Sequence, residues 1–223
     1  MTFTAIIPAR RKDKILKDKN ILEFADSNLL VHKILQLKKV KKVNEILVST
    51  ECNEIAKIAK DQGVSIDQRP IRYSGLNANF NDFVKYISTL VKTENILWAP
   101  VTCPLVTSSI FDSAISKFKF SYNKGFDSLI SCNKIKRFLL DNNGPLNFRF
   151  YKSSRKGSKL PVFYEFINAI TIARAKDIEK WKYNWGKVPY FFELKENFRI
   201  DICSKFDYEI AKIIYKNQNE LYY

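Results

Sequence analysis

The first twenty residues constrain the fold of this chain more than any other stretch. An apolar run from Thr2 to Ile7 ends at Pro8 and is followed by a polar loop that ends at Asn20. An apolar run that stops at a proline before a polar loop is typical of a buried strand with a loop at its carboxyl end. Open α/β sheets bind their ligands at that end of the strands. We therefore expect a ligand site beside this loop.

The loop is strongly basic. It has six basic and two acidic residues, namely Arg10, Arg11, Lys12, Lys14, Lys17 and Lys19 against Asp13 and Asp18. Cations gathered at the end of a strand suit a polyanionic ligand such as a nucleoside triphosphate. The alternative is a solvated basic turn without a ligand, and charge alone does not exclude it.

Composition indicates one soluble domain. The 223 residues are 46% hydrophobic and 14% aromatic, which is enough for one good core. No stretch approaches the roughly 20 apolar residues of a membrane span, and the start lacks the pattern of a signal peptide, so we expect a cytoplasmic protein. The four cysteines form no C-x-x-C pair and are expected to be reduced thiols. The single histidine, His32, lies in a helical apolar pattern and is expected on a helix face.

The net charge of +15 raises the possibility of nucleic-acid binding. Much of the excess is lysine spread along predicted helix faces, however, as between Leu37 and Lys42. The sequence shows no helix-turn-helix, zinc-finger or aromatic RNP-type pattern. Nucleic-acid binding therefore stays a secondary hypothesis.

Apolar strands and amphipathic helices alternate along most of the chain, which predicts an α/β fold. After the first strand, we expect strands at 44–50, 64–66, 95–99 and 125–131, and helices at 28–40, 54–59, 79–91, 110–118 and 209–216. Gly63 is placed to end the second helix, and Ser108 or Ser109 to cap the fourth. The pattern breaks between 133 and 160, and a loop of that length usually serves function or an interface.

Several segments resemble one family. Pro8-Ala9-Arg10, Lys14 and Lys19-Asn20-Ile21 resemble the signature P-A-R-G-G-S-K-G-I-P-x-K-N-I of the CMP-sugar synthetases, the acylneuraminate and Kdo cytidylyltransferases. Residues 11–13 stand where that signature has two glycines and a serine, and glycines there let backbone amides approach phosphate closely. We expect the extra side-chain cations to replace part of those amide contacts.

Later segments resemble the same family in the same order. The matching stretches are Val48-Ser49-Thr50-Glu51, Glu54-Ile55-Ala56, Arg69-Pro70, the turn 100–105 (P-T-S-P-L in the family), 127–131 (D-S-x-x-S), 161–172 (P-x-x-Y-x-x-N-G-A-I-Y) and 200–207 (I-D-I-D-T-x-x-D). The resemblance implies a Rossmann-like nucleotidyltransferase fold, with a mostly parallel sheet and helices on both faces. It also implies a single domain over 1–223, with 133–165 as a lid and dimerisation insertion, and a homodimer.

The activity implied by the resemblance is cytidylyl transfer. CTP would activate an acidic sugar, sialic-acid-like or Kdo-like, for surface polysaccharide or glycoconjugate synthesis, with release of pyrophosphate. Residue by residue, the resemblance assigns the triphosphate to Arg10, Lys14 and Lys19, the nucleotide to Pro8, Ala9, Arg10, Asn20, Arg69 and Thr102, and the acceptor to Arg69, Tyr164 and Asn168.

Magnesium is the implied cofactor, with Asp201 as its ligand. In the family, alternate carboxylates leave a strand on one face and hold the ion. Cys203 stands in place of the second carboxylate, and a neutral thiol is a poor ligand for a hard cation. Asp207 keeps the outer acidic position, where we expect a helix-capping role or a first-turn charge more than a metal ligand.

Taken singly, these residues allow other interpretations. Arg69 could bind phosphate or anchor a loop through carbonyl groups, and Thr102 could contact ribose or base or cap the next segment. Tyr164 could bind substrate or pack in a strand. For the whole protein, the alternatives are a different phosphorylated acceptor or nucleotide, and a family fold with altered or lost catalysis that serves as a binding or assembly partner.

Overall fold

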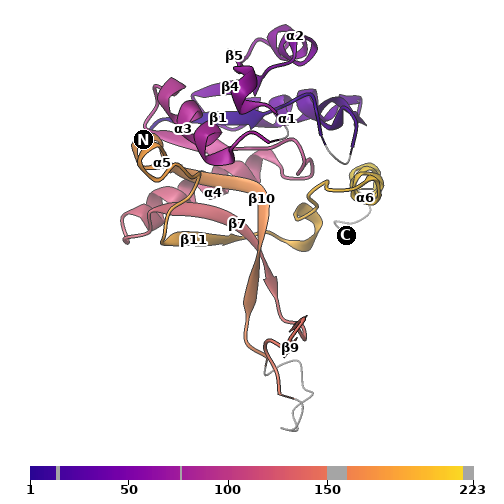
Figure 1. The fold of residues 1–223 in the computed structure, drawn as a ribbon, viewed down its shortest axis with the longest axis vertical. Coiled ribbons are helices and arrows are strands. Elements are labelled where there is room, and N and C mark those ends of the chain that lie inside the picture. The colour runs from indigo at the N-terminus through magenta and orange to yellow at the C-terminus, as the bar shows by residue number, and fades with distance from the viewer. Residues whose placement is uncertain (14–15, 76, 150–159, 218–223) are drawn as a thin grey trace.

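One seven-stranded sheet runs through the molecule (Figure 1). Its strands are β1 (Phe3–Pro8), β4 (Glu45–Thr50), β5 (Ser65–Gln68), β6 (Asn95–Trp98), β7 (Ser128–Ile135), β10 (Phe163–Arg174) and β11 (Pro189–Glu193). They lie in the order β11-β7-β10-β6-β1-β4-β5, with β10 antiparallel to β6 and β7 and every other pair parallel. This computed structural model describes residues 1–13, 16–75, 77–149 and 160–217.

Helices cover both faces of the sheet. They are α1 (Leu29–Lys38), α2 (Asn53–Asp61), α3 (Phe80–Leu90), α4 (Ser108–Tyr122), α5 (Ala175–Trp181) and α6 (Lys205–Lys216). Buried residues of α1, α2, α4 and α6 belong to one apolar cluster, and those of α3 and α5 belong to a second. β1 contributes Phe3, Ala5 and Ile7 to the first cluster and Ile6 to the second, because successive side chains of a strand point to opposite faces. The prediction of a mostly parallel sheet with helices on both faces is confirmed.

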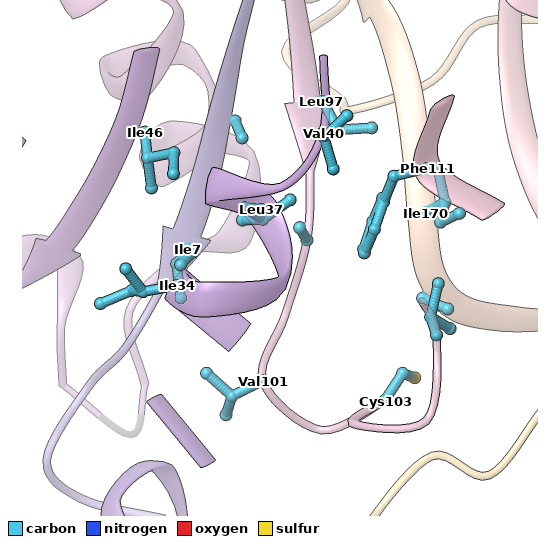
Figure 2. Close-up of a cluster of buried hydrophobic side chains, with 14 of the residues drawn as sticks. Ile7, Ile34, Leu37, Val40, Ile46, Leu97, Val101, Cys103, Phe111 and Ile170 are labelled. Carbon is cyan, nitrogen blue, oxygen red and sulfur yellow. The ribbon is translucent and has the colours of Figure 1, made fainter. Parts of the chain in front are cut away.

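The larger cluster forms the main core. Figure 2 shows side chains from the sheet and from α1 and α4 that point toward one another, among them Ile7, Ile34, Leu37, Leu97, Phe111 and Ile170. All of these are 0% or 1% exposed. Strands buried on both faces need continuous apolar runs, which is why β1 and β6 were recognisable in the sequence.

Local signals define the helix ends. The side chain of Asn28 accepts a hydrogen bond from the Val31 N–H and caps α1. Gly63 has φ +64°, as expected of a glycine that follows a helix such as α2. Ser204 caps α6, and the carboxylate of Asp207 accepts a hydrogen bond from the Ser204 hydroxyl in return. The capping role expected for Asp207 is therefore confirmed.

The sheet positions a ligand site at its switch point. β1 pairs with β4 on one side and with β6 on the other, so the connections from β1 and β6 leave the sheet side by side. In open α/β sheets the ligand crevice lies outside the carboxyl ends of the strands at this point. The basic loop after β1 and the turn 99–105 after β6 both lie there.

An arm projects from the sheet below β7 and β10 (Figure 1). We define the arm as residues 132–149 and 160–166. Within it, β7 and β10 pair with Phe163 opposite Ile135 and Phe166 opposite Cys132. The arm also contains the short strands β8 (Leu140–Asp141) and β9 (Gly144–Pro145). Residues 150–159, within the predicted insertion, lie outside the described residues. The arm falls within the predicted insertion 133–165, and its role as lid or dimer contact stays a prediction.

Two details of the sequence prediction were wrong. The N-cap of α4 is Thr107 and not Ser108 or Ser109. β7 begins at Ser128 instead of 125, because Gly125 adopts φ +90° in the turn before it, and it continues past 131 to Ile135. Three further elements were not predicted: β10, a single strand that is interrupted by a bulge, α5 and β11.

Candidate active site

A cavity of about 290 Å³ opens where β1 and β6 end. Seven of the site residues that the resemblance assigned line this cavity, namely Pro8, Arg10, Lys19, Asn20, Arg69, Thr102 and Asn168. The other lining residues are Asp13, Tyr73, Ala78, Asn79, Phe80, Phe83, Pro100 and Val101. Segments that are far apart in the sequence therefore meet in one cavity, as the resemblance implied.

Two cations of the first loop face this cavity and share a carboxylate. Lys19 Nζ lies 2.9 Å from Asp13 Oδ2, and Arg10 Nη2 lies 4.0 Å from the same oxygen. Asp13 is largely buried, with 10% of its side chain exposed, and its Oδ1 accepts a hydrogen bond from the Leu16 N–H. The pair of cations is thus held in place by an acid that a stronger anion could displace. Lys14 lies outside the described residues.

The loop is fastened to the sheet beneath the cavity. Buried Asn20 donates from Nδ2 to the Arg10 carbonyl oxygen at 2.6 Å, and the N–H of buried Ala9 donates to the Ser49 carbonyl oxygen at 2.9 Å. Ala9 does not line the cavity, so its contribution is to anchor the backbone before Arg10. Asn20 both lines the cavity and fixes Arg10.

Three further cations of the loop, Arg11, Lys12 and Lys17, do not line the cavity. Arg11 turns away from the cavity and forms ion pairs with Asp18, at 2.8 Å, and with Glu54 of α2. Its backbone N–H donates to Glu51 Oε1 at 2.8 Å. Lys12 and Lys17 are exposed and do not line the cavity. The expectation that these cations take over amide contacts is therefore not supported for Arg11, Lys12 or Lys17.

Arg69 anchors a loop, as one of the two interpretations of the sequence expected, and its binding of phosphate stays a prediction. It is buried, and its guanidinium donates to the hydroxyl of Ser49 at 3.0 Å and to the Ser49 carbonyl oxygen, so it anchors the end of β4. The same group lies 4.1 Å above the ring of Phe83 and lines the cavity. Burial lowers the pKa of Arg69 to about 10, so the guanidinium still carries its charge at neutral pH.

A buried carboxylate supports Arg69 from behind. Asp67 Oδ2 accepts a hydrogen bond from the Ser49 hydroxyl at 2.6 Å, and its Oδ1 accepts one from the Tyr86 hydroxyl at 2.6 Å. The parallel register of β4 and β5 sets Ser49 opposite Asp67. Asp67 was not recognised in the sequence. Ser49 was noted as part of the Val48-Ser49-Thr50-Glu51 match, but its contact with Asp67 follows only from the register of the two strands.

Thr102 and Asp201 meet at the other side of the cavity. The Ile202 N–H donates to the Thr102 carbonyl oxygen at 2.8 Å and brings the segment around Asp201 against the turn after β6. Burial raises the pKa of Asp201, and a hydrogen bond from Thr102 and the positive charge of Lys19 oppose that rise. Asp201 therefore lies next to one lining hydroxyl and one lining cation, although it is not itself part of the lining.

The bulge in β10 carries Asn168 into the cavity. The register of β10 and β7 shifts between Phe166 and Thr171, and Ser131 holds the shifted segment: its hydroxyl contacts the Ile167 and Ile170 carbonyl oxygens at 2.6 and 3.1 Å and accepts from the Ile170 N–H at 2.8 Å. Bulges of this kind redirect side chains next to functional sites. Tyr164 lies on the arm, four residues before Asn168 in β10. It is 46% exposed, its ring lies 5.0 Å from that of Phe191, and it is not part of the cavity lining.

The chemistry of the donors allows a magnesium ion only together with a ligand. Asp201 is a carboxylate next to the predicted phosphate site, whereas Cys203 is an exposed thiol and Asp207 is committed to the cap of α6. Among the described residues, no group of three or more histidine, cysteine, aspartate or glutamate side chains could hold a metal ion. One carboxylate fits a Mg²⁺ ion that takes most of its ligands from phosphates and water.

Comparisons with known proteins agree with this geometry. A family model described as cytidylyltransferase matches residues 4–223. The chain is 26% identical over 231 residues to a pseudaminic acid cytidylyltransferase of Campylobacter jejuni, covering 99% of both proteins. It is 25% identical over 219 residues to an N-acylneuraminate cytidylyltransferase of Escherichia coli, covering 96% of this chain and 52% of that protein. The chain thus spans about half the length of the E. coli relative.

Solved structures show the same fold. A CMP:2-keto-3-deoxy-manno-octonic acid synthetase complexed with CTP superposes with a TM-score of 0.74 at 12% identity, over 98% of this chain and 100% of that one. A cytidylyltransferase from Leptospira borgpetersenii gives a TM-score of 0.63 at 20% identity, over 98% and 96% of the two chains. In the described part of the chain, no helix is long and apolar enough to cross a membrane. With a family model that spans residues 4–223 and a sheet and cavity arranged as described, the chain belongs to the cytidylyltransferase family.

Proposed function

We propose that this protein transfers the cytidylyl group of CTP to an acidic sugar and releases pyrophosphate. The observation that carries the proposal is the convergence of Arg10, Lys19 and Arg69 on one cavity at the switch point of the sheet. Three cations around a hollow suit a triphosphate. Family membership and this cavity favour an enzyme over the two alternatives, a non-catalytic binding protein and a nucleic-acid-binding protein.

In this reaction an oxygen of the acceptor attacks the α-phosphorus of CTP and the bond to pyrophosphate breaks. The protein mainly needs to position the two partners and to stabilise negative charge on the phosphate oxygens. We assign that stabilisation to Arg10 and Lys19, together with Lys14 by resemblance. Asn20 and Thr102 would contact ribose or base, and CTP phosphates would replace Asp13 as the partner of Lys19.

We propose magnesium as the cofactor, held by Asp201 and by the phosphates of CTP. A bound Mg²⁺ would supply further positive charge against the phosphate oxygens. The Thr102 side chain, which lies close enough to Asp201 to lower the pKa of its carboxyl, would hold the carboxylate toward that ion. Because Asp201 is the only carboxylate assigned, we expect binding of the metal to depend on the nucleotide.

The acceptor would lie between Asn168 and a row of aromatic rings. Phe80, at the mouth of the cavity, contacts Tyr183 at 5.9 Å between ring centroids. The row continues from Tyr183 to Trp185 at 5.4 Å and from Trp185 to Phe166 at 6.1 Å. Aromatic faces pack well against the C–H faces of sugar rings. The relatives named for N-acylneuraminate and pseudaminic acid support a nine-carbon acidic sugar as the class of acceptor.

The test begins with the nucleotide. We expect CTP with magnesium to raise the melting temperature of the protein more than ATP, GTP or UTP. Arg10→Met should weaken CTP binding at least about tenfold, because it removes a charge from the cavity. Lys12→Met is the matched control, since Lys12 is an exposed cation of the same loop that does not line the cavity. No stabilisation by any nucleotide, or equal effects of the two variants, would refute the assignment.

Turnover is tested next by release of pyrophosphate from CTP with a panel of acidic sugars. Asp201→Asn should abolish magnesium-dependent turnover and leave the melting temperature unchanged within a few degrees. Metal-dependent CTP binding without turnover on any acceptor would instead support the non-catalytic alternative. Steeply salt-dependent binding to random DNA or RNA would revive the nucleic-acid hypothesis.

We also propose a homodimer formed through the arm, in a cytoplasmic protein. The support is the apolar character of the arm: it exposes Phe138, Leu140, Leu146 and Phe163 at 45%, 63%, 54% and 38%. Exposed apolar groups gathered on one projection mark an interaction surface. Sedimentation of the protein as a monomer at micromolar concentration would refute this part of the proposal.

A further inference from the structure

Lys33 is the feature of the structure that the proposed reaction leaves unexplained. It lies on α1 and is 0% exposed. Its Nζ donates to the Cys103 carbonyl oxygen at 2.9 Å and lies 5.0 Å from the centre of the Phe111 ring. None of the ion pairs found in the described part of the chain includes it. A buried ammonium without a carboxylate is costly, and one hydrogen bond to a carbonyl does not offset that cost.

The carbonyl that Lys33 holds belongs to the turn after β6. Three successive carbonyl groups of this turn are each fixed from a different direction. The Thr102 carbonyl accepts from the Ile202 N–H at 2.8 Å, the Cys103 carbonyl accepts from Lys33, and the Pro104 carbonyl accepts from Gln36 Nε2 at 2.6 Å. Thr102 lines the cavity together with Pro100 and Val101, and it lies near Asp201.

We infer that Lys33 is a positioning residue of the active site, whose buried ammonium fixes the turn 102–104 so that Thr102 faces the nucleotide and Asp201. Neighbours of Lys33 fit this role. Cys103 is 0% exposed and packs in the main core with Phe111 (Figure 2), so the turn has an apolar side buried under Lys33 and a polar side in the cavity. Burial lowers the pKa of Lys33 to about 8, so the group is still mostly charged at neutral pH.

The effect of Lys33 on nucleotide binding rests on the proposed function, whereas its anchoring of the turn 102–104 does not. The two parts are tested separately. Lys33→Met removes the ammonium and keeps the length of the side chain. Lys38→Met is the matched control, because Lys38 is an exposed lysine of the same helix that also donates to a backbone carbonyl, that of Gln62. Alkylation of the cysteines, followed by mass spectrometry of the peptides, reports the anchor without any nucleotide.

We expect Lys33→Met to speed alkylation of Cys103 about tenfold or more, because a freed turn opens locally. Cys132, which is also buried but lies on β7, should react at the wild-type rate. CTP affinity should fall about tenfold, since a displaced Thr102 loses its hydrogen bond to the nucleotide, and one such bond contributes about 1 kcal/mol. The melting temperature should stay equal or rise, because an uncompensated buried charge is gone. Lys38→Met should change none of these.

The other outcomes distinguish failure of the inference from loss of the fold and from failure of the proposed function. Wild-type alkylation of Cys103 in Lys33→Met would overturn it, and so would faster alkylation with unchanged CTP affinity in a protein whose wild type binds CTP. If both Cys103 and Cys132 become reactive, the variant has lost its general fold, and Lys33→Gln, which keeps a shorter neutral donor, replaces it. Loss of protection at both cysteines in Lys33→Gln as well would make Lys33 a general stability residue and overturn the inference. A wild type that binds no CTP refutes the proposed function, while selective exposure of Cys103 still supports the anchor.

Discussion

His32 predicts how the stability of this protein depends on pH. It is the single histidine of the chain, and its Nε2 lies 2.9 Å from the Pro104 carbonyl oxygen. The rings of Phe24 and Tyr215 lie 5.0 and 5.2 Å from the imidazole ring. Burial lowers the pKa of His32 from 6.5 to about 4. The imidazole is therefore neutral in the folded protein at pH 5, whereas in the unfolded chain it is protonated.

The sign and size of the effect follow from this difference. The pKa of His32 is lower in the folded protein than in the unfolded chain. The free energy of unfolding is therefore unaffected by His32 above pH 6.5 and decreases as the pH falls from 6.5 toward 4, because only the unfolded chain binds the proton there. With these two pKa values, the free energy of unfolding contributed by His32 is about 2 kcal/mol lower at pH 5 than at pH 7.

Urea unfolding at pH 7 and pH 5 measures the effect in the wild type and in His32→Gln. Carboxylates also titrate toward low pH, but their contribution is common to the two proteins and cancels in the comparison. The wild type should lose about 2 kcal/mol more than the variant between the two pH values. An equal loss in both proteins would refute the reasoning, because it would mean that His32 takes up its proton in the folded state as readily as in the unfolded chain.

Three further results are expected. Asp67→Asn should weaken CTP binding about tenfold in a calorimetric titration, because Asp67 and Ser49 orient Arg69; wild-type affinity would contradict this support. Asp207→Ala should lower the free energy of unfolding by about 1 kcal/mol through loss of the α6 cap and leave CTP affinity unchanged, and a large loss of metal-dependent turnover would contradict the capping role. Tyr164→Ala should leave CTP affinity unchanged, because Tyr164 lies on the arm; weaker CTP binding would show that the arm reaches the nucleotide.

β1, β4 and β6 could be predicted because they are buried on both faces. All residues from Phe3 to Ile7 and all residues of β6 are buried. A strand that is buried on both faces needs a continuous apolar run, and such a run can be recognised in the sequence. β11 and the arm end of β10 are half or fully exposed, with residues 163–166 all exposed. These segments are strands because they pair with β7, and pairing leaves little trace in the pattern of hydrophobic residues.

The same distinction separates the predicted from the missed parts of the site. Arg10 and Thr102 lie in segments that follow buried strands, and Asn20 lies in the loop that begins at Arg10, so the sequence alone placed them at the carboxyl edge of the sheet. The role of Asp67 depends on the register of β4 against β5, and that of Lys33 depends on which carbonyl its helix reaches. Neither depends on the residues next to them in the chain, so no local motif indicates them.

The loop without glycines explains where phosphate recognition must lie in this member of the family. The Arg11 N–H is bonded to Glu51 and the Leu16 N–H to Asp13, so these two amides are occupied by carboxylates of the protein. The Arg11 side chain is likewise committed, since it ties the loop to Asp18 and to α2. Ion pairs thus tie the loop to α2 and to its own carboxylates. Under the proposed function, the triphosphate would bind mainly to the side-chain cations that line the cavity, and CTP would have to separate Lys19 from Asp13.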